Sequence, residues 1–136
     1  MSAIEELTGR IKAEKGKKLT QILTDEEILK PGKFADKIAS DLELKKKFKT
    51  AQLRKVFNKV KEIERAIERG EDYKSKILEL YPKLAYSTGR GLMPKNFFKL
   101  LTLLLEKAEK NKEDAKMVVK LITAIVAYSK LHGDRG

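Results

Sequence analysis

The segment most informative about the architecture is residues 113–131, which read EDAKMVVKLITAIVAYSKL. One side of a helix with this sequence carries β-branched residues such as Val118 and Ile122. The other side carries Met117 and Leu121, so hardly any polar side is left. A helix that is apolar nearly all round is buried at the centre of a bundle or beneath a partner. We therefore expect one of these two positions for this segment.

Helical periodicity also runs through most of the preceding sequence. Apolar residues recur at intervals of three and four, the spacing of one helix face, and no segment shows the period of two that marks a strand. The expected fold class is all-α, a compact bundle of five or six helices. The expected helices lie around residues 4–11, 34–48, 50–69, 73–86, 94–110 and 113–131.

Capping and helix-breaking residues indicate where several of these helices begin and end. Thr50 fits an N-cap, and Gly70 fits the end of the helix that Thr50 begins. Pro82 predicts a kink or a break in the next helix, and residues 87–93 are expected to form a loop. Pro94 is the expected first residue of the helix that follows this loop.

The first third of the chain is the least certain region. Residues 24–27, TDEE, fit a capping box, but Pro31 and Gly32 soon end the helix that it begins. The expected organisation is an N-terminal helical arm of uncertain order, residues 1–33, followed by a helical bundle domain, residues 34–136. Such an arm is either mobile or docked on another copy, so the oligomeric state of the isolated protein stays open.

The composition excludes several kinds of site. The 136 residues include no cysteine, which excludes disulfides, thiolate zinc sites and cysteine nucleophiles and fits a reducing compartment. No apolar run approaches the ~20 residues of a membrane-spanning helix, and the N-terminus lacks the features of a signal peptide. We expect a soluble, cytoplasmic protein. Abundant lysine and glutamate with little asparagine and glutamine is typical of thermophile proteins.

The net charge of +11 is concentrated in the middle of the chain. Residues 1–44 have a net charge of −1, residues 45–100 one of +10, and residues 101–136 one of +2. Residues 45–61 alone carry eight basic side chains and no acidic one. A surface that serves only solubility interleaves the two signs, so this segregation favours a face that binds a polyanion. Nucleic acid fits better than a membrane, because the other side of the 50–69 helix is needed for the core.

Catalytic and metal-binding chemistry has little support in the sequence. The single histidine, His132, falls at a helix C-terminus, where an imidazolium suits the helix dipole. Glu62 and Glu64 stand among lysines, which predicts surface ion pairs rather than acid–base catalysis. Residues 89–91, Gly-Arg-Gly, lack the P-loop pattern, so an ordinary turn and a phosphate contact are equal alternatives there. We expect no catalytic residue, no metal and no cofactor.

Three tyrosines lie at apolar positions of the expected helices: Tyr81, Tyr86 and Tyr128. Core packing with the hydroxyl at the surface is the expected role of each. Base stacking is the less favoured alternative, because the chain has no aromatic pair of the kind that RNA-recognition sheets carry.

Three segments of the chain read as motifs in a fixed order: TAQLRKVFNKV at residues 50–60, PKLAYSTGR at 82–90 and ITAIVAYSKLHG at 122–133. Together they resemble the small subunit of type III-A CRISPR–Cas effectors, the Csm complexes. The family patterns are T-x-Q-[IL]-R-[KR]-x-[FY], P-K-[LI]-A-Y-x-x-G-R and E-A-[IV]-[VL]-A-Y-[HY]-[KR]. Thr123 and Ser129 depart from the third pattern. The resemblance covers about residues 34–133.

The resemblance implies a small helical bundle without catalytic activity. Several copies would stack head to tail beside the ribonuclease backbone subunits, under the large polymerase-like subunit, and contact the backbone of the guide RNA–target RNA duplex. The family motifs place candidate RNA contacts at Gln52, Arg54, Lys55, Lys83 and Arg90. The charge pattern adds further candidates, and the full set is Lys45, Lys46, Lys47, Lys49, Gln52, Arg54, Lys55, Lys59, Lys83, Arg90 and Lys95.

Two other classes of function remain as alternatives at this point. The helices at residues 34–48 and 50–69 are also compatible with a helical DNA-binding transcriptional regulator, in which a short turn precedes a recognition helix. A helical enzyme or metal protein is disfavoured by one histidine, no cysteine and no convergent carboxylates.

Overall fold

The computed structural model describes residues 2–43 and 50–132. These residues form eight helices and no strand, which confirms the all-α class. Six of the helices have ten residues or more, in agreement with the five or six expected. In chain order they are α1 (Ala3–Ala13), α2 (Leu19–Ile22), α3 (Asp25–Leu29), α4 (Phe34–Glu43), α5 (Thr50–Glu68), α6 (Tyr73–Gly89), α7 (Lys95–Lys110) and α8 (Lys112–Leu131).

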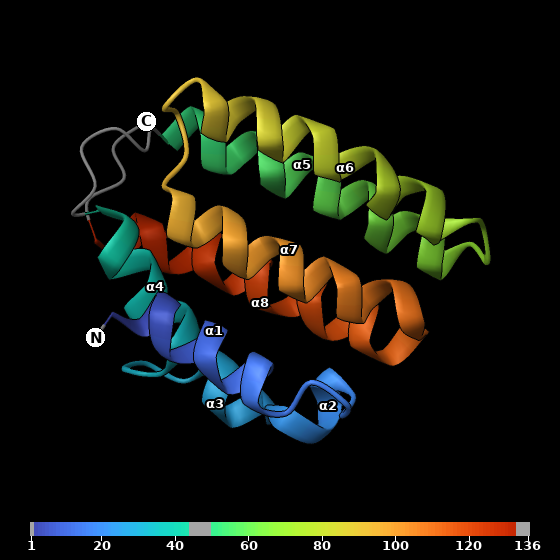
Figure 1. Ribbon diagram of the computed structural model, residues 1–136, viewed down its shortest axis with the longest axis horizontal. Helices are drawn as coiled ribbons and strands as arrows, with labels where there is room; N and C mark the ends of the chain where they lie inside the picture. The colour runs from blue at the N-terminus through green and yellow to red at the C-terminus, as the bar shows by residue number, and fades with distance from the viewer. Residues whose placement is uncertain (1, 44–49, 133–136) are drawn as a thin grey trace.

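The helices are arranged around the pair formed by α7 and α8 (Figure 1). The hairpin of α5 and α6 lies on one side of this pair, and α1 to α4 lie on the other. Helix α8 contacts α2, α3, α4, α5 and α7, so it touches both sides of the molecule. Of the two positions expected for the segment with apolar residues on nearly every side, these contacts show the centre of the bundle.

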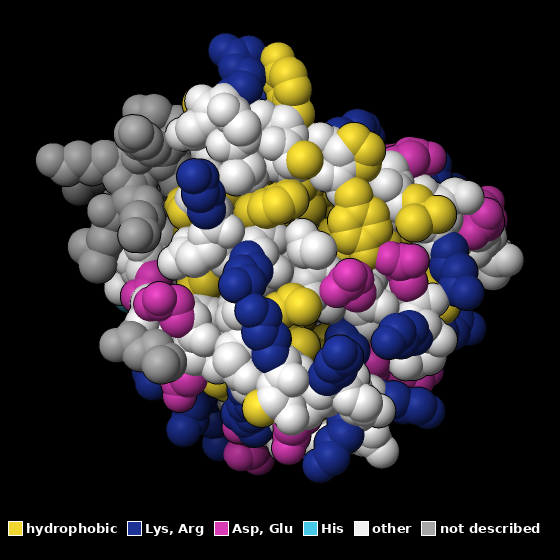
Figure 2. Space-filling model, in the orientation of Figure 1, with side chains coloured by type: hydrophobic (Ala, Val, Ile, Leu, Met, Phe, Trp, Pro, Cys, Tyr) yellow, Lys and Arg dark blue, Asp and Glu magenta, His cyan; other side chains and the backbone are white. Residues whose placement is uncertain are grey.

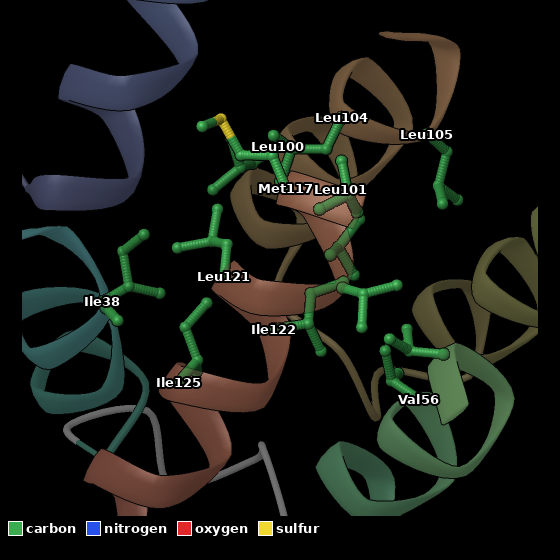
Figure 3. Packing of buried hydrophobic residues seen from close by; sticks show 14 of the residues in the cluster. Ile38, Val56, Leu100, Leu101, Leu104, Leu105, Met117, Leu121, Ile122 and Ile125 are labelled. Carbon is green, nitrogen blue, oxygen red and sulfur yellow. The ribbon is translucent and has the colours of Figure 1, made fainter. Parts of the chain in front are cut away.

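The buried side chains of α8 point in different directions into one continuous core. Figure 3 shows Leu121 and Ile125 directed toward Ile38 of α4, while Ile122 lies on the side of Val56 of α5. All five of these side chains are at most 5% exposed. Each fully buried aliphatic side chain of this size contributes about 1.5–3 kcal/mol of transfer free energy, which explains why α8 holds the layers together.

The N-terminal segment belongs to the same core as the other helices. Ile4, Leu7 and Ile11 of α1 are at most 2% exposed, and α1 packs against α7 and α4. The predicted capping box at Thr24 is confirmed, since its hydroxyl accepts from the Glu27 N–H at 3.2 Å. The division of the chain between residues 33 and 34 stays a prediction.

Two glycines end the helices of the α5–α6 hairpin. Gly70 has a φ of +67°, and the Glu71 N–H donates to the Ala66 carbonyl at 2.8 Å, which is the Schellman closure expected at a C′ glycine. Gly91, with a φ of +73°, plays the same part after α6, where the Leu92 N–H donates to the Ser87 carbonyl at 2.9 Å.

The second closure shows that the predicted loop at residues 87–93 begins too early. Helix α6 continues to Gly89, because Gly91 rather than Gly89 supplies the left-handed conformation that ends it. Helix α6 also continues through Pro82 without a break. Proline has no N–H to donate to the carbonyl of Leu78, but both residues lie on the exposed side of the helix, where water can reach that carbonyl. Pro94 is the N-cap of α7 rather than its first residue.

No helix in the described part of the chain is long and apolar enough to cross a membrane.

Candidate nucleic-acid interface

The predicted contact residues fall into three groups. Lys45, Lys46, Lys47 and Lys49 lie outside the described residues, as does the side chain of the proposed N-cap Thr50. A second group lies on the hairpin, with Lys83 on α6 and the others on α5. The third group follows the hairpin, with Arg90 just after α6 and Lys95 at the start of α7. The members on α5 are Gln52, Arg54, Lys55 and Lys59.

Helices α5 and α6 enclose a groove of about 510 Å³, which we call the hairpin groove. On α5 its lining residues recur at spacings of three, four and seven, from Gln52 through Lys55 and Val56 to Lys59. The matching series on α6 runs from Leu80 to Ser87. The complete lining is Gln52, Lys55, Val56, Asn58, Lys59, Leu80, Pro82, Lys83, Leu84, Tyr86 and Ser87.

Four of the predicted contact residues therefore line one groove: Gln52, Lys55, Lys59 and Lys83. Arg54 and Lys95 are exposed but do not line it. The residues on α5 line the groove together because helix positions three or four residues apart are neighbours on the helix surface. Residues from two separate sequence motifs meet in this way because α5 and α6 are antiparallel neighbours.

The lysines of the hairpin groove repel one another. The ammonium groups of Lys59 and Lys83 lie close together: the contact lowers the pKa of Lys83, whereas the same contact and then Glu62 raise the pKa of Lys59. Glu62 offsets part of this repulsion, because one of its carboxylate oxygens lies 3.3 Å from the Nζ of Lys59. An anion bound between the two lysines would relieve the remaining repulsion, so the groove favours a phosphate or another anion electrostatically.

Arg90 reaches the edge of the hairpin groove through Tyr86. Its Nη1 donates to the Tyr86 hydroxyl at 3.1 Å, and its guanidinium carbon lies 5.7 Å from the centroid of the ring. Tyr86 is 65% exposed, so the expectation that it packs into the core is wrong. Tyr86 follows the buried Leu84 by two residues, about 200° around the helix, so it lies on the opposite, solvent side of α6. Arg90, four residues further on, lies on the same side.

The other two tyrosines behave as predicted, with partly buried rings whose hydroxyls reach polar partners. The Tyr81 hydroxyl donates to the carboxylate of Glu109 on α7, and burial, followed by that carboxylate, raises the pKa of Tyr81. The Tyr128 hydroxyl donates to the Leu29 carbonyl at 2.7 Å. Tyr86 is thus distinguished from both by its exposure.

The acidic residues singled out in the sequence are engaged in surface ion pairs. Glu62 pairs with Lys59, and Glu64 pairs with Lys61, three residues apart along α5 in each case. His132 caps the C-terminus of α8 and contacts the carboxylate of Asp36 on α4. Within the described residues, no cluster of three or more histidine and acidic side chains could hold a metal ion.

Basic and acidic side chains are mixed around α7. Figure 2 shows lysine, arginine and acidic side chains on both sides of a strip of hydrophobic side chains on the face that carries α7. The groove between α1 and α7 illustrates this, because Lys12 and Lys110 line it together with Glu106 and Glu109. The hairpin groove differs in having no acidic side chain among its lining residues.

Comparison with known proteins identifies the family. The family model described as Csm2 Type III-A matches residues 25–135, most of the chain and all of the hairpin groove. Neither the search of curated proteins nor the search of solved structures returns a match. Because the family model covers well over half of the sequence, the chain belongs to the Csm2 Type III-A family and is a small subunit of type III-A CRISPR effector complexes.

Proposed function

We propose that the protein is a non-catalytic subunit that holds RNA inside the Csm effector complex. Several copies stack along the guide RNA–target RNA duplex and contact its backbone without reading its sequence. Its protein partners are other copies of itself, the ribonuclease backbone subunit and the large polymerase-like subunit. Base pairing supplies the sequence specificity, so a cationic surface of the right shape is sufficient for this role.

The observation that carries this proposal is the meeting of two motifs in the hairpin groove. Lys55 and Lys59 come from the first motif and Lys83 from the second, and all three line the same groove. Lysine binds phosphate as a point charge and reads no base, and the release of counterions from the nucleic acid drives the association. A groove with this lining therefore supports binding to a phosphodiester backbone.

The same geometry disfavours the DNA-binding regulator. A recognition helix needs one unobstructed face to enter the major groove of DNA. Helix α5 packs against α8 with its apolar stripe, and α6 lies alongside it. The lysines therefore face a groove between two helices rather than project from a single exposed helix.

A charge-reversal experiment tests the proposal. The variant is Lys55→Glu/Lys83→Glu, and the matched control is Lys37→Glu/Lys112→Glu, which changes the net charge equally at exposed positions outside the groove. We expect the groove variant to lose at least about tenfold in RNA affinity at moderate salt, because each lost phosphate contact removes one counterion-release contribution. The measurements are RNA binding by fluorescence anisotropy and RNA retention by the assembled complex.

Both variants should keep wild-type helicity by circular dichroism, since the changed side chains are exposed. Equal RNA affinity in the groove variant and the control would overturn the assignment of the groove. Specific protection of a duplex DNA site by the wild-type protein would favour the regulator instead.

A further inference from the structure

The floor of the hairpin groove is not what backbone contact alone requires. Val56, Leu80 and Leu84 line it and are between 2% and 5% exposed, so the lysines stand at the rim of an apolar floor. A duplex backbone presents charged phosphates and ribose hydroxyls, for which an apolar surface has no use. The flat faces of an unpaired base, in contrast, are apolar and gain free energy by leaving water.

The amide of Gln52 is a second feature of the groove. The Gln52 side chain lines the groove although the residue is only 9% exposed. One end of its amide has a long hydrogen bond of 3.5 Å, donated by the Ser87 hydroxyl, and the other end has no partner among the described residues. An amide offers a donor and an acceptor side by side, which is the pattern that the edge of a base satisfies.

Tyr86 supplies an aromatic ring at the same place. It lines the groove, it is 65% exposed, and Arg90 lies over it at 5.7 Å. Aromatic rings and guanidinium planes are the surfaces on which proteins stack unpaired bases.

We infer that the hairpin groove binds one unpaired nucleotide of the RNA, with its base between Tyr86 and Gln52 over the apolar floor and its phosphates at Lys55, Lys59 and Lys83. This inference rests on the proposed function and adds to it the form of RNA that the groove selects. The groove volume of about 510 Å³ lies within the range of pockets that enclose molecules of nucleotide size. A free ribonucleotide shares this chemistry, so the test must separate the two sources.

The test compares three RNAs with the full-length protein at one salt concentration, because electrostatic affinity depends on salt. They are a fully paired duplex, the same duplex with one unpaired nucleotide, and a single strand. We expect the wild-type protein to bind the duplex with the unpaired nucleotide about tenfold more tightly than the paired duplex, because stacking of one base on an aromatic ring adds binding free energy of that order. The same comparison in the assembled Csm complex uses RNA retention as its measurement.

Two variants of one residue separate stacking from folding. Tyr86→Ala should abolish the preference for the unpaired nucleotide, and Tyr86→Phe should keep it, since the ring does the stacking. The affinity for the paired duplex is measured with the same variants, so that the preference is expressed as the ratio of the two affinities. A 2-aminopurine at the unpaired position should be quenched by the wild-type protein and by Tyr86→Phe, but not by Tyr86→Ala.

The outcomes distinguish this inference from the proposed function. If Lys55→Glu/Lys83→Glu weakens all three RNAs while Tyr86→Ala weakens none selectively, the backbone site stands and the nucleotide site is overturned. If Tyr86→Ala weakens the paired duplex as much as the unpaired form, Tyr86 has a general role and the inference also fails. Saturation of the site by a ribonucleoside monophosphate at an affinity equal to that of RNA would assign the groove to free nucleotides instead.

Discussion

The N-terminal segment, α1 to α4, and the α5–α6 hairpin pack on opposite sides of the α7–α8 pair, and both contribute apolar side chains to one core (Figure 1). The N-terminal segment is in addition attached to α8 by polar groups. The Asp114 carboxylate accepts from the N–H groups of Leu19 at 2.7 Å and Thr20 at 3.1 Å, and Tyr128 donates to the Leu29 carbonyl. The hairpin packs on α8 through an apolar stripe, and its lysines and Gln52 face its own groove.

The difference shows that positive charge alone does not mark a binding site. The α1–α7 groove also has a close pair of lysines at its edge, since Lys99 of α7 lowers the pKa of Lys12, which lines the groove. The buried lysine of this groove, Lys107, donates to the carbonyls of Lys15 and Lys17. In the hairpin groove Lys59 pairs with Glu62, whereas Lys55 and Lys83 form no ion pair within the described residues, so their charges are available to a ligand.

The largest change in unfolding free energy is expected at Asp114, the most buried of the polar residues that attach the N-terminal segment to α8. Asp114→Ala leaves the N–H groups of Leu19 and Thr20 without their charged acceptor, at a residue that is 1% exposed. Urea denaturation should show a loss of about 3 kcal/mol in the free energy of unfolding. The control Lys120→Gln breaks an exposed ion pair with Asp25 at 3.0 Å and should cost less than about 1 kcal/mol.

RNA affinity completes this first test. Under conditions where Asp114→Ala is still folded, it should bind RNA as the wild type does, because Asp114 lies outside the hairpin groove. A loss of stability similar to that of the control would mean that the N-terminal segment is held by apolar contacts, as the hairpin is.

The reverse pattern is expected in the hairpin. Lys55→Gln/Lys83→Gln should reduce the slope of log affinity against log salt by about two, as two phosphate contacts are lost. Its unfolding free energy should stay within about 0.5 kcal/mol of the wild type, since exposed substitutions have little effect on stability. The matched variant Lys12→Gln/Lys99→Gln removes the other lysine pair and should leave the salt slope unchanged. Equal slopes in the two variants would erase the distinction between the two grooves.

The architecture could be predicted from the sequence where one physical signal dominates. Residues 113–131 are apolar on nearly all sides, so only a central position could bury Leu121 and Ile122 together. The end of α5 could be predicted from Gly70, since that residue alone there tolerates a positive φ without strain. The end of α6 could not, because Gly89 and Gly91 are equivalent in the sequence and only the folded chain shows which one adopts it.

The binding site could be predicted only in part. The charge pattern indicated α5, but the meeting of Lys59 with Lys83 depends on how α5 and α6 pack, which periodicity does not specify. The exposure of Tyr86 could have been predicted, because Tyr86 follows the buried Leu84 by two residues and so lies on the opposite side of α6. Its neighbour Arg90 could have been predicted only if the helix had been extended to Gly89, since the spacing of four then indicates a shared face.

A smaller effect is expected at the second polar contact of the N-terminal segment. Tyr128→Phe removes the hydrogen bond to the Leu29 carbonyl and keeps the ring, so the unfolding free energy should fall by about 1 kcal/mol. Tyr86→Phe is the matched change in the hairpin and should have almost no effect, because Tyr86 is 65% exposed. Differential scanning calorimetry measures both. An equal loss in the two variants would contradict the contrast between the regions.

The smallest effect concerns pH, through Asp36 of α4. Contact with His132 of α8 and a hydrogen bond of 2.8 Å from the Gly32 N–H hold the pKa of the Asp36 carboxyl below its usual value. A carboxyl group whose pKa is lowered by folding stabilises the folded state at every pH above its pKa in the unfolded chain, which is about 3.9 for aspartate. This stabilisation is lost as the pH falls through the pKa of the folded state.

Unfolding by urea between pH 6 and pH 3 should therefore show a shallower acid decline in Asp36→Asn than in the wild type, by less than about 1 kcal/mol at the extremes. His132→Gln should reproduce part of the change, because it removes the contact between α8 and α4 but keeps the bond from Gly32. An identical acid decline in wild type and Asp36→Asn would mean that this contact does not fasten α4. The polar attachment of the N-terminal segment would then lie at Asp114 and Tyr128, nearer α2 and α3 than α4.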